Sequence, residues 1–256
     1  MSTIFYVEEG EGLPIIFIHG FCETHELWND FISPFIKNFR VLTLDLPGFG
    51  RSPLPIEEFT IDSIALMVIN WLKEMGISKA IFVGHSLGGY VALSIIKQNP
   101  GLATGLCLFH STAFADTAEK KMSRDKVNDF VRKHGVTPYI RTYVPGLFAH
   151  KDDMLISGIY EMGIKTDPKA LILYSNAMKE RSDSILVLKK SAYPVMIIAG
   201  LQDTLISQED LAQQVTFPLN SAFTILEHSA HLGMIEEREV SGNALLKFAQ
   251  KCNSSI

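Results

Sequence analysis

Residues 84–89, Gly-His-Ser-Leu-Gly-Gly, place a serine between two glycines, each two positions away from it. This segment follows the short apolar run at residues 80–83 and precedes residues 90–96, whose composition is compatible with a helix. A Gly-x-Ser-x-Gly sequence between a strand and a helix forms a tight turn that exposes the serine hydroxyl above the sheet. We therefore expect Ser86 to be a catalytic nucleophile.

A serine hydroxyl is a weak nucleophile at neutral pH, so it needs a base to accept its proton and an acid to orient that base. Asp203 follows the apolar run at residues 195–199 and is our candidate acid, although aspartate is also a common turn residue. Two histidines, His228 and His231, follow the run at residues 222–226, and His231 lies deeper in the loop. Both are candidates for the base at this point.

The oxyanion that forms when serine attacks a carbonyl group needs two backbone N–H donors. Leu87, directly after the serine, offers one of them at the start of the expected helix. The second donor is expected from the loop after the apolar run at residues 15–18, where Gly20 allows a close approach of the backbone. Our candidate there is the N–H of Phe21, and we interpret His19 as a residue that fixes the loop.

The elements that must position these residues are short apolar runs bounded by turn residues. They lie at residues 15–18, 41–44, 80–83, 106–109, 195–199 and 222–226. Runs of this length without polar alternation indicate strands buried on both faces. Apolar residues spaced by three and four across residues 61–72 predict an amphipathic helix, with Thr60 as its N-cap. The alternation predicts a mostly parallel sheet flanked by helices, with active residues at the carboxyl ends of its strands.

Residues 112–190 interrupt this alternation, and we interpret them as a helical cap inserted into a core made of residues 1–111 and 191–256. Helices are expected at residues 118–134 and 169–181. The insertion holds 14 lysines and arginines against 10 acidic residues, whereas the whole chain carries a net charge of −5. A basic cap could favour anionic substrates, although mixed charges on helices are more often a solvated face. Its aromatic residues either line an apolar site or pack the cap: Phe114, Tyr139, Tyr143, Phe148 and Tyr160.

Composition excludes several other classes of protein. A content of 47% hydrophobic and 20% charged residues is typical of a globular chain, and the acidic balance argues against nucleic acid. Three cysteines without a paired spacing argue against a disulfide framework. No basic n-region and no apolar stretch near the roughly 20 residues that span a bilayer are present. We expect a cytoplasmic protein that binds a small molecule and no membrane.

Two polar features suggest other chemistry only weakly. Residues 45–52 are glycine-rich but lack the lysine and the spacing of a phosphate-binding loop, so a structural turn is the better interpretation. His110 either lines a pocket or is a buried structural histidine. The eight histidines include no His-Glu-x-x-His motif, and His228 with His231 alone is too little for a metal site. We expect no metal and no other cofactor.

These segments together resemble the α/β-hydrolase fold, in its small cap-bearing, esterase-like branch, over nearly the whole chain. The matching segments occur in the family's order: residues 19–21, residues 45–52, residues 84–89, residues 200–203, and His231 followed by Glu236. The resemblance favours His231 over His228 as the base, and it implies a cap inserted after the sixth strand. Ala230 departs from the pattern, because the family usually has glycine before its histidine.

The sequence therefore predicts hydrolysis of a carboxylic ester through an acyl-Ser86 intermediate, with His231 as base and Asp203 as the acid that orients it. A carbon-carbon bond hydrolase, a thioesterase or a lyase could use the same groups. His85 before the serine resembles esterases and lipases more than carbon-carbon hydrolases. A ligand-sensing module with slow or no turnover is the alternative from another class.

Overall fold

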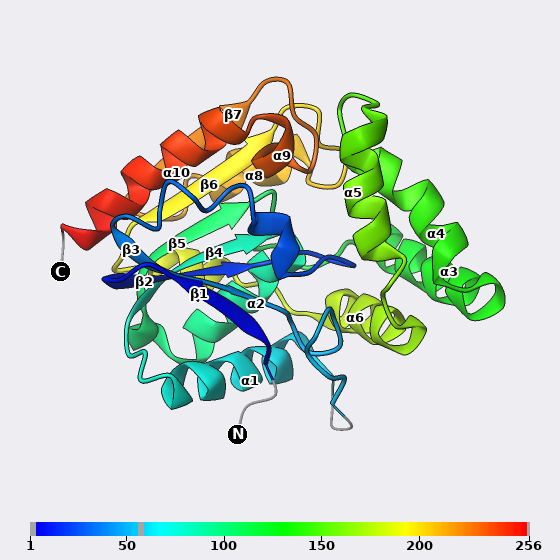
Figure 1. Cartoon of the computed structure of the whole chain (residues 1–256), viewed down its shortest axis with the longest axis horizontal. Helices are drawn as coiled ribbons and strands as arrows, with labels where there is room; N and C mark the ends of the chain where they lie inside the picture. Colours follow the sequence, from blue (N-terminus) through cyan, green and yellow to red (C-terminus); the bar gives the residue numbers. More distant parts are fainter. Residues whose placement is uncertain (1–3, 56–58, 255–256) are drawn as a thin grey trace.

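The computed structural model describes residues 4–55 and 59–254, and these residues form one sheet layered between helices (Figure 1). Its strand order is β1-β3-β2-β4-β5-β6-β7, with β1 antiparallel to β3 and the remaining neighbours parallel. The strands are β1 (Tyr6–Glu9), β2 (Leu13–Ile18), β3 (Phe39–Leu44), β4 (Ala80–His85), β5 (Ala103–Phe109), β6 (Val195–Gly200) and β7 (Ser221–Leu226). The predicted mostly parallel sheet is confirmed.

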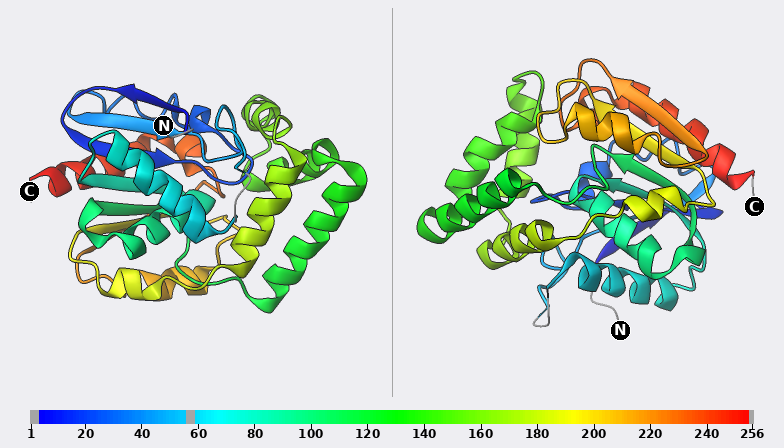
Figure 2. Two further views of the ribbon diagram at one scale, coloured as in Figure 1. Left: turned by 90° about the horizontal axis from the view of Figure 1, so that it is seen from below. Right: turned by 180° about the vertical axis from the view of Figure 1, so that it is seen from behind.

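Helices cover both faces of this sheet. Helices α1 (Ile61–Glu74) and α2 (Leu87–Gln98) lie on one face, and α10 (Arg238–Asn253) lies on the other (Figures 1 and 2). A short helix, α8 (Gln208–Gln214), connects β6 to β7, and α9 (Gly233–Glu236) lies between β7 and α10. Thr60 caps α1 as expected, because its hydroxyl accepts the N–H of Ser63 while the Ser63 hydroxyl accepts the N–H of Thr60. No described helix is long and apolar enough to cross a membrane.

The segment between β5 and β6 is helical, and most of it lies beyond one end of the sheet (Figure 1). Its helices are α3 (Ala118–His134), α4 (Val136–Tyr143), α5 (Asp153–Gly163), α6 (Pro168–Glu180) and α7 (Ile185–Lys189). We refer to residues 112–190 as the cap; their status as a separate unit stays a prediction. The cap follows the fifth of the described strands, not the sixth, because this sheet has one strand fewer ahead of the insertion than the resemblance implied.

Two edge strands differ from the sequence expectation. Strand β1 was not predicted, because Tyr6–Glu9 contains two glutamates and no apolar run. Strand β7 was expected to be buried on both faces, but Phe223 is 44% exposed and Ile225 is 45% exposed. The expectation was wrong because β7 lies at the edge of the sheet, where β6 is its single neighbour. The expectation is confirmed for the predicted runs in β2 and β4, since residues 15–18 and 80–83 are fully buried.

The close packing of α2 against β2 requires glycine at position 88. A Cβ atom there would overlap the carbonyl oxygen of Ile18, whereas a Cβ at Gly158 in α5 would meet no atom within 4 Å. We expect Gly88→Ala to lower the free energy of unfolding by about 3 kcal/mol, because backbone must shift to relieve the overlap. Gly158→Ala should raise it by about 0.5–1 kcal/mol, since alanine favours a helix. Urea unfolding measures both values, and equal effects would contradict this packing.

Candidate active site

The candidate residues follow four neighbouring strands at the carboxyl edge of the sheet. Ser86 comes directly after β4, His110 after β5, Asp203 after β6, and His231 after β7. Because β4, β5, β6 and β7 are consecutive and parallel in the sheet, their ends lie side by side. Residues separated by 145 positions in sequence therefore meet at one edge.

Ser86 has a backbone conformation that few non-glycine residues adopt, with φ at 49° and ψ at −114°. Such strain costs of the order of 1–3 kcal/mol and persists only where the surroundings enforce it. Here the Ser86 N–H donates to the Phe109 carbonyl at 3.0 Å, and the Ser111 hydroxyl donates to the Ser86 carbonyl at 2.7 Å. A Cβ on Gly84 would lie 2.5 Å from the backbone of Gly88, so the turn excludes side chains there.

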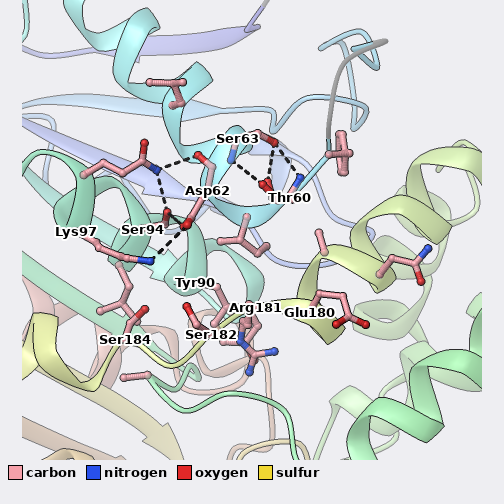
Figure 3. Close-up of a pocket in the computed structure, with 18 of the residues that line it drawn as sticks. Thr60, Asp62, Ser63, Tyr90, Ser94, Lys97, Glu180, Arg181, Ser182 and Ser184 are labelled. Atoms are coloured by element: carbon pink, nitrogen blue, oxygen red, sulfur yellow. Dashed lines mark hydrogen bonds and ion pairs between the residues drawn. The ribbon is translucent and has the colours of Figure 1, made fainter.

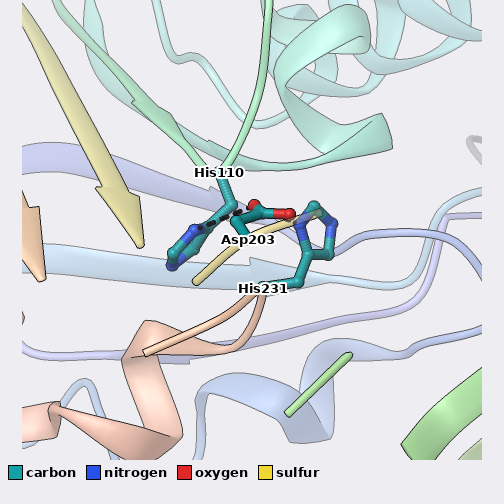
Figure 4. Close-up of side chains that lie close together, drawn as sticks. All are labelled: His110, Asp203 and His231. Atoms are coloured by element: carbon teal, nitrogen blue, oxygen red, sulfur yellow. Dashed lines mark hydrogen bonds and ion pairs between the residues drawn. The ribbon is translucent and has the colours of Figure 1, made fainter. Parts of the chain in front are cut away.

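Asp203 and His231 form a direct, buried contact (Figure 4). Oδ2 of Asp203 lies 2.7 Å from Nδ1 of His231, and the two side chains are 1% and 2% exposed. The backbone N–H groups of Leu205 and Ile206 donate to the other carboxylate oxygen. Burial opposes the charge of Asp203, but the two facing imidazoles hold its pKa well below the ordinary value. The ionised carboxylate accepts hydrogen bonds only, so Nδ1 of His231 carries the proton.

The opposite ring nitrogen of His231 is left as a base. Nε2 is buried and has no hydrogen-bond partner in the described part of the chain. A buried polar atom without a partner costs about 1–3 kcal/mol, so such a position calls for an explanation. Within residues 4–55 and 59–254, Ser86 forms no hydrogen bond with His231; the structure brings the two to the same edge without joining them. His228 is exposed, and its backbone N–H donates to Glu237.

His110 is a site residue whose contact the sequence did not signal. It is fully buried with φ at 47°, and Nδ1 lies 3.4 Å from Oδ2 of Asp203 (Figure 4). Backbone N–H groups face both ring nitrogens, that of Gly233 at 3.0 Å from Nε2 and that of Gly200 at 3.2 Å from Nδ1. Burial lowers the pKa of His110 to about 4. Asp203 thus lies between two imidazole rings.

The loop expected to supply an oxyanion donor is fixed by His19. Its Nδ1 donates to the Gly20 carbonyl at 2.8 Å, and its Nε2 accepts the N–H of Leu46 at 2.9 Å. The backbone N–H groups of Phe21 and Leu87 donate to no acceptor within the described residues. The two groups are therefore available as donors, and their role in binding an oxyanion stays a prediction.

A buried ion pair lies beneath this loop. Nδ1 of His85 faces Oε2 of Glu23 at 2.9 Å, and its Nε2 faces the carbonyl oxygen of His231 at 2.9 Å. Both nitrogens meet acceptors, so both carry protons and His85 is an imidazolium. Glu23 also accepts the N–H of Gly20 at 2.6 Å, and a Cβ on Gly20 would lie 2.7 Å from both partners. The ion pair therefore links the loop at residues 19–22 to the backbone of His231.

The loop around His231 is tied to the cap and to the chain that follows it. The N–H of His231 donates to the Leu147 carbonyl at 2.9 Å. Glu236 accepts the N–H of Ala149 at 2.7 Å with one oxygen and that of Ala230 at 2.9 Å with the other. The backbone of Ala230 is not in the left-handed region, so alanine in place of the family's glycine causes no strain.

Three of these side chains could in principle hold a metal ion. The ligand atoms of His110, Asp203 and His231 lie within 4.8 Å of one another. However, each faces a proton or a proton donor: Nδ1 of His231 donates to Asp203, and Nε2 of His110 accepts from Gly233. Hydrogen bonds account for the cluster without an ion, and the expectation of no metal stays a prediction.

A cavity of about 310 Å³ opens beside Ser86 and is lined by core and cap. Phe21, Tyr139 and Tyr143 supply much of its apolar wall. Figure 3 shows a second cavity of about 630 Å³, on the other side of Tyr90, whose described lining contains none of the candidate catalytic residues. Tyr90 lines both cavities, and the Arg181 guanidinium lies 3.8 Å over its ring.

This fold and site define a hydrolase of the α/β class. The family model described as the alpha/beta hydrolase fold matches residues 14–238, and the chain belongs to that family. A thermophilic esterase from Thermogutta terrifontis, with malate bound, has a TM-score of 0.92 at 25% identity, covering 98% of this chain and 94% of that one.

Two curated relatives extend over almost the same length. A 2-hydroxy-6-oxo-6-(2'-aminophenyl)hexa-2,4-dienoic acid hydrolase from Metapseudomonas resinovorans is 26% identical over 254 residues, covering 96% of this chain and 87% of that protein. A 3-oxoadipate enol-lactonase from Acinetobacter baylyi is 22% identical over 244 residues, covering 93% and 89% of the two chains. These similar proteins are all named as hydrolytic enzymes, but they differ in substrate.

We expect the buried pair of Glu23 and His85 to stabilise the fold most at intermediate pH. Burial opposes both charges, but His85 holds the pKa of Glu23 below its ordinary 4.5, and Glu23 raises the pKa of His85 above its ordinary 6.5. The contribution of Glu23 is lost as pH falls through its lowered pKa, and that of His85 is lost as pH rises through its raised pKa. The stabilisation by the pair is therefore complete between the two ordinary pKa values of 4.5 and 6.5, near pH 5–6.

We expect Glu23→Gln to lower the free energy of unfolding near pH 6 by about 3 kcal/mol, because it leaves a buried imidazolium unpaired. Urea unfolding across pH 4–9 measures this loss. The control Glu8→Gln removes a partly exposed carboxylate paired with Arg40, and should cost less than about 1 kcal/mol. A similar small loss for both variants would show that His85 is not charged.

Proposed function

We propose that the protein is a serine hydrolase that cleaves a carboxylic ester through an acyl-Ser86 intermediate. The observation that carries the proposal is the lone base at Nε2 of His231: it is buried, it has no partner among the described residues, and its ring is oriented by an ionised Asp203. A position of this kind is costly unless a substrate-dependent step uses it. Proton transfer from the neighbouring Ser86 hydroxyl is such a step.

In the first half of the reaction, the Ser86 hydroxyl rotates toward Nε2 of His231 and attacks the ester carbonyl as its proton moves to Nε2. The new C–O bond forms at Oγ, and the carbonyl oxygen becomes an oxyanion. This oxyanion accepts hydrogen bonds from the backbone N–H groups of Phe21 and Leu87. The carbonyl then re-forms, the ester C–O bond breaks, and the imidazolium returns its proton to the leaving alcohol. Asp203 stays ionised throughout and stabilises the positive ring.

In the second half, water replaces the alcohol. It gives a proton to Nε2 of His231 and attacks the acyl carbon, and the second tetrahedral intermediate collapses with loss of Oγ as the leaving group. Oγ recovers the proton, so the free carboxylic acid and the resting Ser86 are regenerated. No redox change and no cofactor enter this balance.

A carbon-carbon bond hydrolase is the second candidate. The Metapseudomonas resinovorans relative is named for a hydroxy-oxo-dienoic acid that contains no ester, so its hydrolysis must cleave a carbon-carbon bond. Thioester hydrolysis and lyase chemistry could use the same three side chains. The esterase from Thermogutta terrifontis and the enol-lactonase from Acinetobacter baylyi, each named for ester or lactone chemistry, favour the ester. A ligand-sensing role is the candidate from another class.

Replacing Ser86 with alanine should abolish the burst of p-nitrophenol from p-nitrophenyl butyrate and lower kcat by about 1,000-fold or more. The reason is that alanine has no hydroxyl group to form the acyl ester. Stopped-flow absorbance measures the burst and the steady state together. Ser254→Ala, at an exposed serine beyond α10, is the matched control and should match the parent. Full turnover by Ser86→Ala would contradict the mechanism.

A panel of substrates separates the candidates. The panel offers the same acyl group as an oxygen ester, as a thioester and as part of a 1,5-diketone. We expect the oxygen ester to give the highest kcat/KM of the three. Preference for the diketone would assign the protein to carbon-carbon cleavage. Turnover near zero on all three, together with ligand-dependent movement of the cap, would favour the sensor.

A further inference from the structure

The wall of the cavity beside Ser86 carries more positive than negative charge. Its charged lining residues within the described chain are Asp116, Lys120 and Arg124, which lie in or just before α3. The rest of the lining is polar or apolar, with aromatic rings on the core side and the cap side. A substrate group in this space therefore meets two cations and one carboxylate.

The carboxylate is already neutralised by a third cation. Nη1 of Arg181 donates to Oδ1 of Asp116 at 2.7 Å, and Nε of Arg124 donates to Oδ2. The Arg181 side chain is 6% exposed and also donates to the carbonyl oxygens of Met178 and Phe114, which fixes it in place. Asp116 thus carries one negative charge against two guanidinium groups, which leaves one excess positive charge at this wall.

The two terminal nitrogens of the Arg124 guanidinium group are available to a ligand. Nε is its one described hydrogen-bond donor in use, and neither terminal nitrogen has an acceptor among the described residues. The side chain is 22% exposed, so much of it is removed from water. Two adjacent N–H groups held in one plane match the two oxygens of a carboxylate. The contact with Asp116 holds this plane still before any ligand arrives.

Lys120 reinforces the positive charge on the same wall. It precedes Arg124 by four residues, so the two side chains lie on the same face of α3. Its ammonium donates to the Leu205 carbonyl at 3.1 Å, which places it where the cap meets the loop after Asp203. Both cations therefore face the same space as the Ser86 hydroxyl.

We propose that Arg124, with Lys120 beside it, binds a carboxylate of the substrate, and that the enzyme acts on small esters carrying a second, unreacting carboxylate. The inference rests on the acyl-Ser86 function proposed above. Ser86 and Arg124 line one cavity of about 310 Å³, so the scissile carbonyl and the carboxylate belong to the same short molecule. A half-ester of a dicarboxylic acid has this chemistry.

The test compares two esters that differ in one charge: mono-p-nitrophenyl glutarate and its methyl ester. The parent protein should show the higher kcat/KM with the anionic ester. Arg124→Met should lower the anionic-to-neutral ratio of kcat/KM by about 10- to 100-fold, the equivalent of one charged bidentate contact. Its kcat/KM for the neutral ester reports whether the variant is folded and active. Arg124→Lys, which keeps the charge without the planar fork, should give an intermediate ratio.

Lys126→Met is the matched control, because it removes an exposed cation of the same helix that does not line the cavity. It should leave the ratio within about two-fold, since an exposed charge outside the cavity is screened by salt. No preference of the parent for the anionic ester, or an equal loss in Arg124→Met and Lys126→Met, would overturn the proposal.

A binding measurement keeps this inference separate from the proposed reaction. Glutarate itself should raise the Tm of the parent and of Lys126→Met, but not that of Arg124→Met. If no ester is cleaved and glutarate still stabilises the parent through Arg124, the acyl-serine function fails and the carboxylate site stands. If esters are cleaved and glutarate gives no Arg124-dependent shift, the carboxylate site fails and the reaction stands.

Discussion

The structure of the site depends on a single buried charge, the carboxylate of Asp203. A carboxylate that is 1% exposed must be surrounded by donors, and here Nδ1 of His231 and the backbone N–H groups of Leu205 and Ile206 provide them. Because a carboxylate accepts hydrogen bonds only, His231 must hold its proton on the side facing Asp203. The lone pair on the other side of the ring is a consequence of that arrangement. The same carboxylate also stabilises the ring once it is protonated.

Two further clusters of charged side chains follow the same rule at different depths. Below the loop of residues 19–22, Glu23 and His85 neutralise each other and connect the Gly20 N–H to the His231 carbonyl. Above the serine, Asp116 is neutralised by Arg181 and orients Arg124. In the lower pair every charge has a partner within the chain. In the upper group one carboxylate serves two guanidinium groups, and that excess of positive charge distinguishes a structural ion pair from a wall prepared for a ligand.

Much of this fold follows from local patterns. The apolar runs marked six of the seven described strands, and the glycines around Ser86 marked the turn, because tight backbone packing leaves a signature in residue type. Strand β1 left none, since an edge strand with two glutamates resembles a loop. The number of strands ahead of the cap came from the resemblance and not from a pattern in the residues, and it was wrong by one.

The contacts of the site were harder to predict than its positions. Asp203 and His231 could be proposed because each ends a strand, but the contact of His110 with Asp203 depends on the pairing of β5 with β6 and on a positive φ. The pairing of Glu23 with His85 joins residues 62 positions apart, and no spacing rule connects them. Arg124 was one of many cap cations in the sequence; its two free nitrogens become visible only once Arg181 is seen to neutralise Asp116.

The central claim is that Ser86 becomes covalently acylated during turnover. Its most direct test is mass spectrometry of the protein quenched in acid while p-nitrophenyl butyrate is being hydrolysed, followed by peptide mapping. The account predicts a butyryl adduct confined to the peptide that contains Ser86, appearing and decaying as substrate is consumed. Steady turnover with no adduct on that peptide, or with the adduct on another residue, would contradict it.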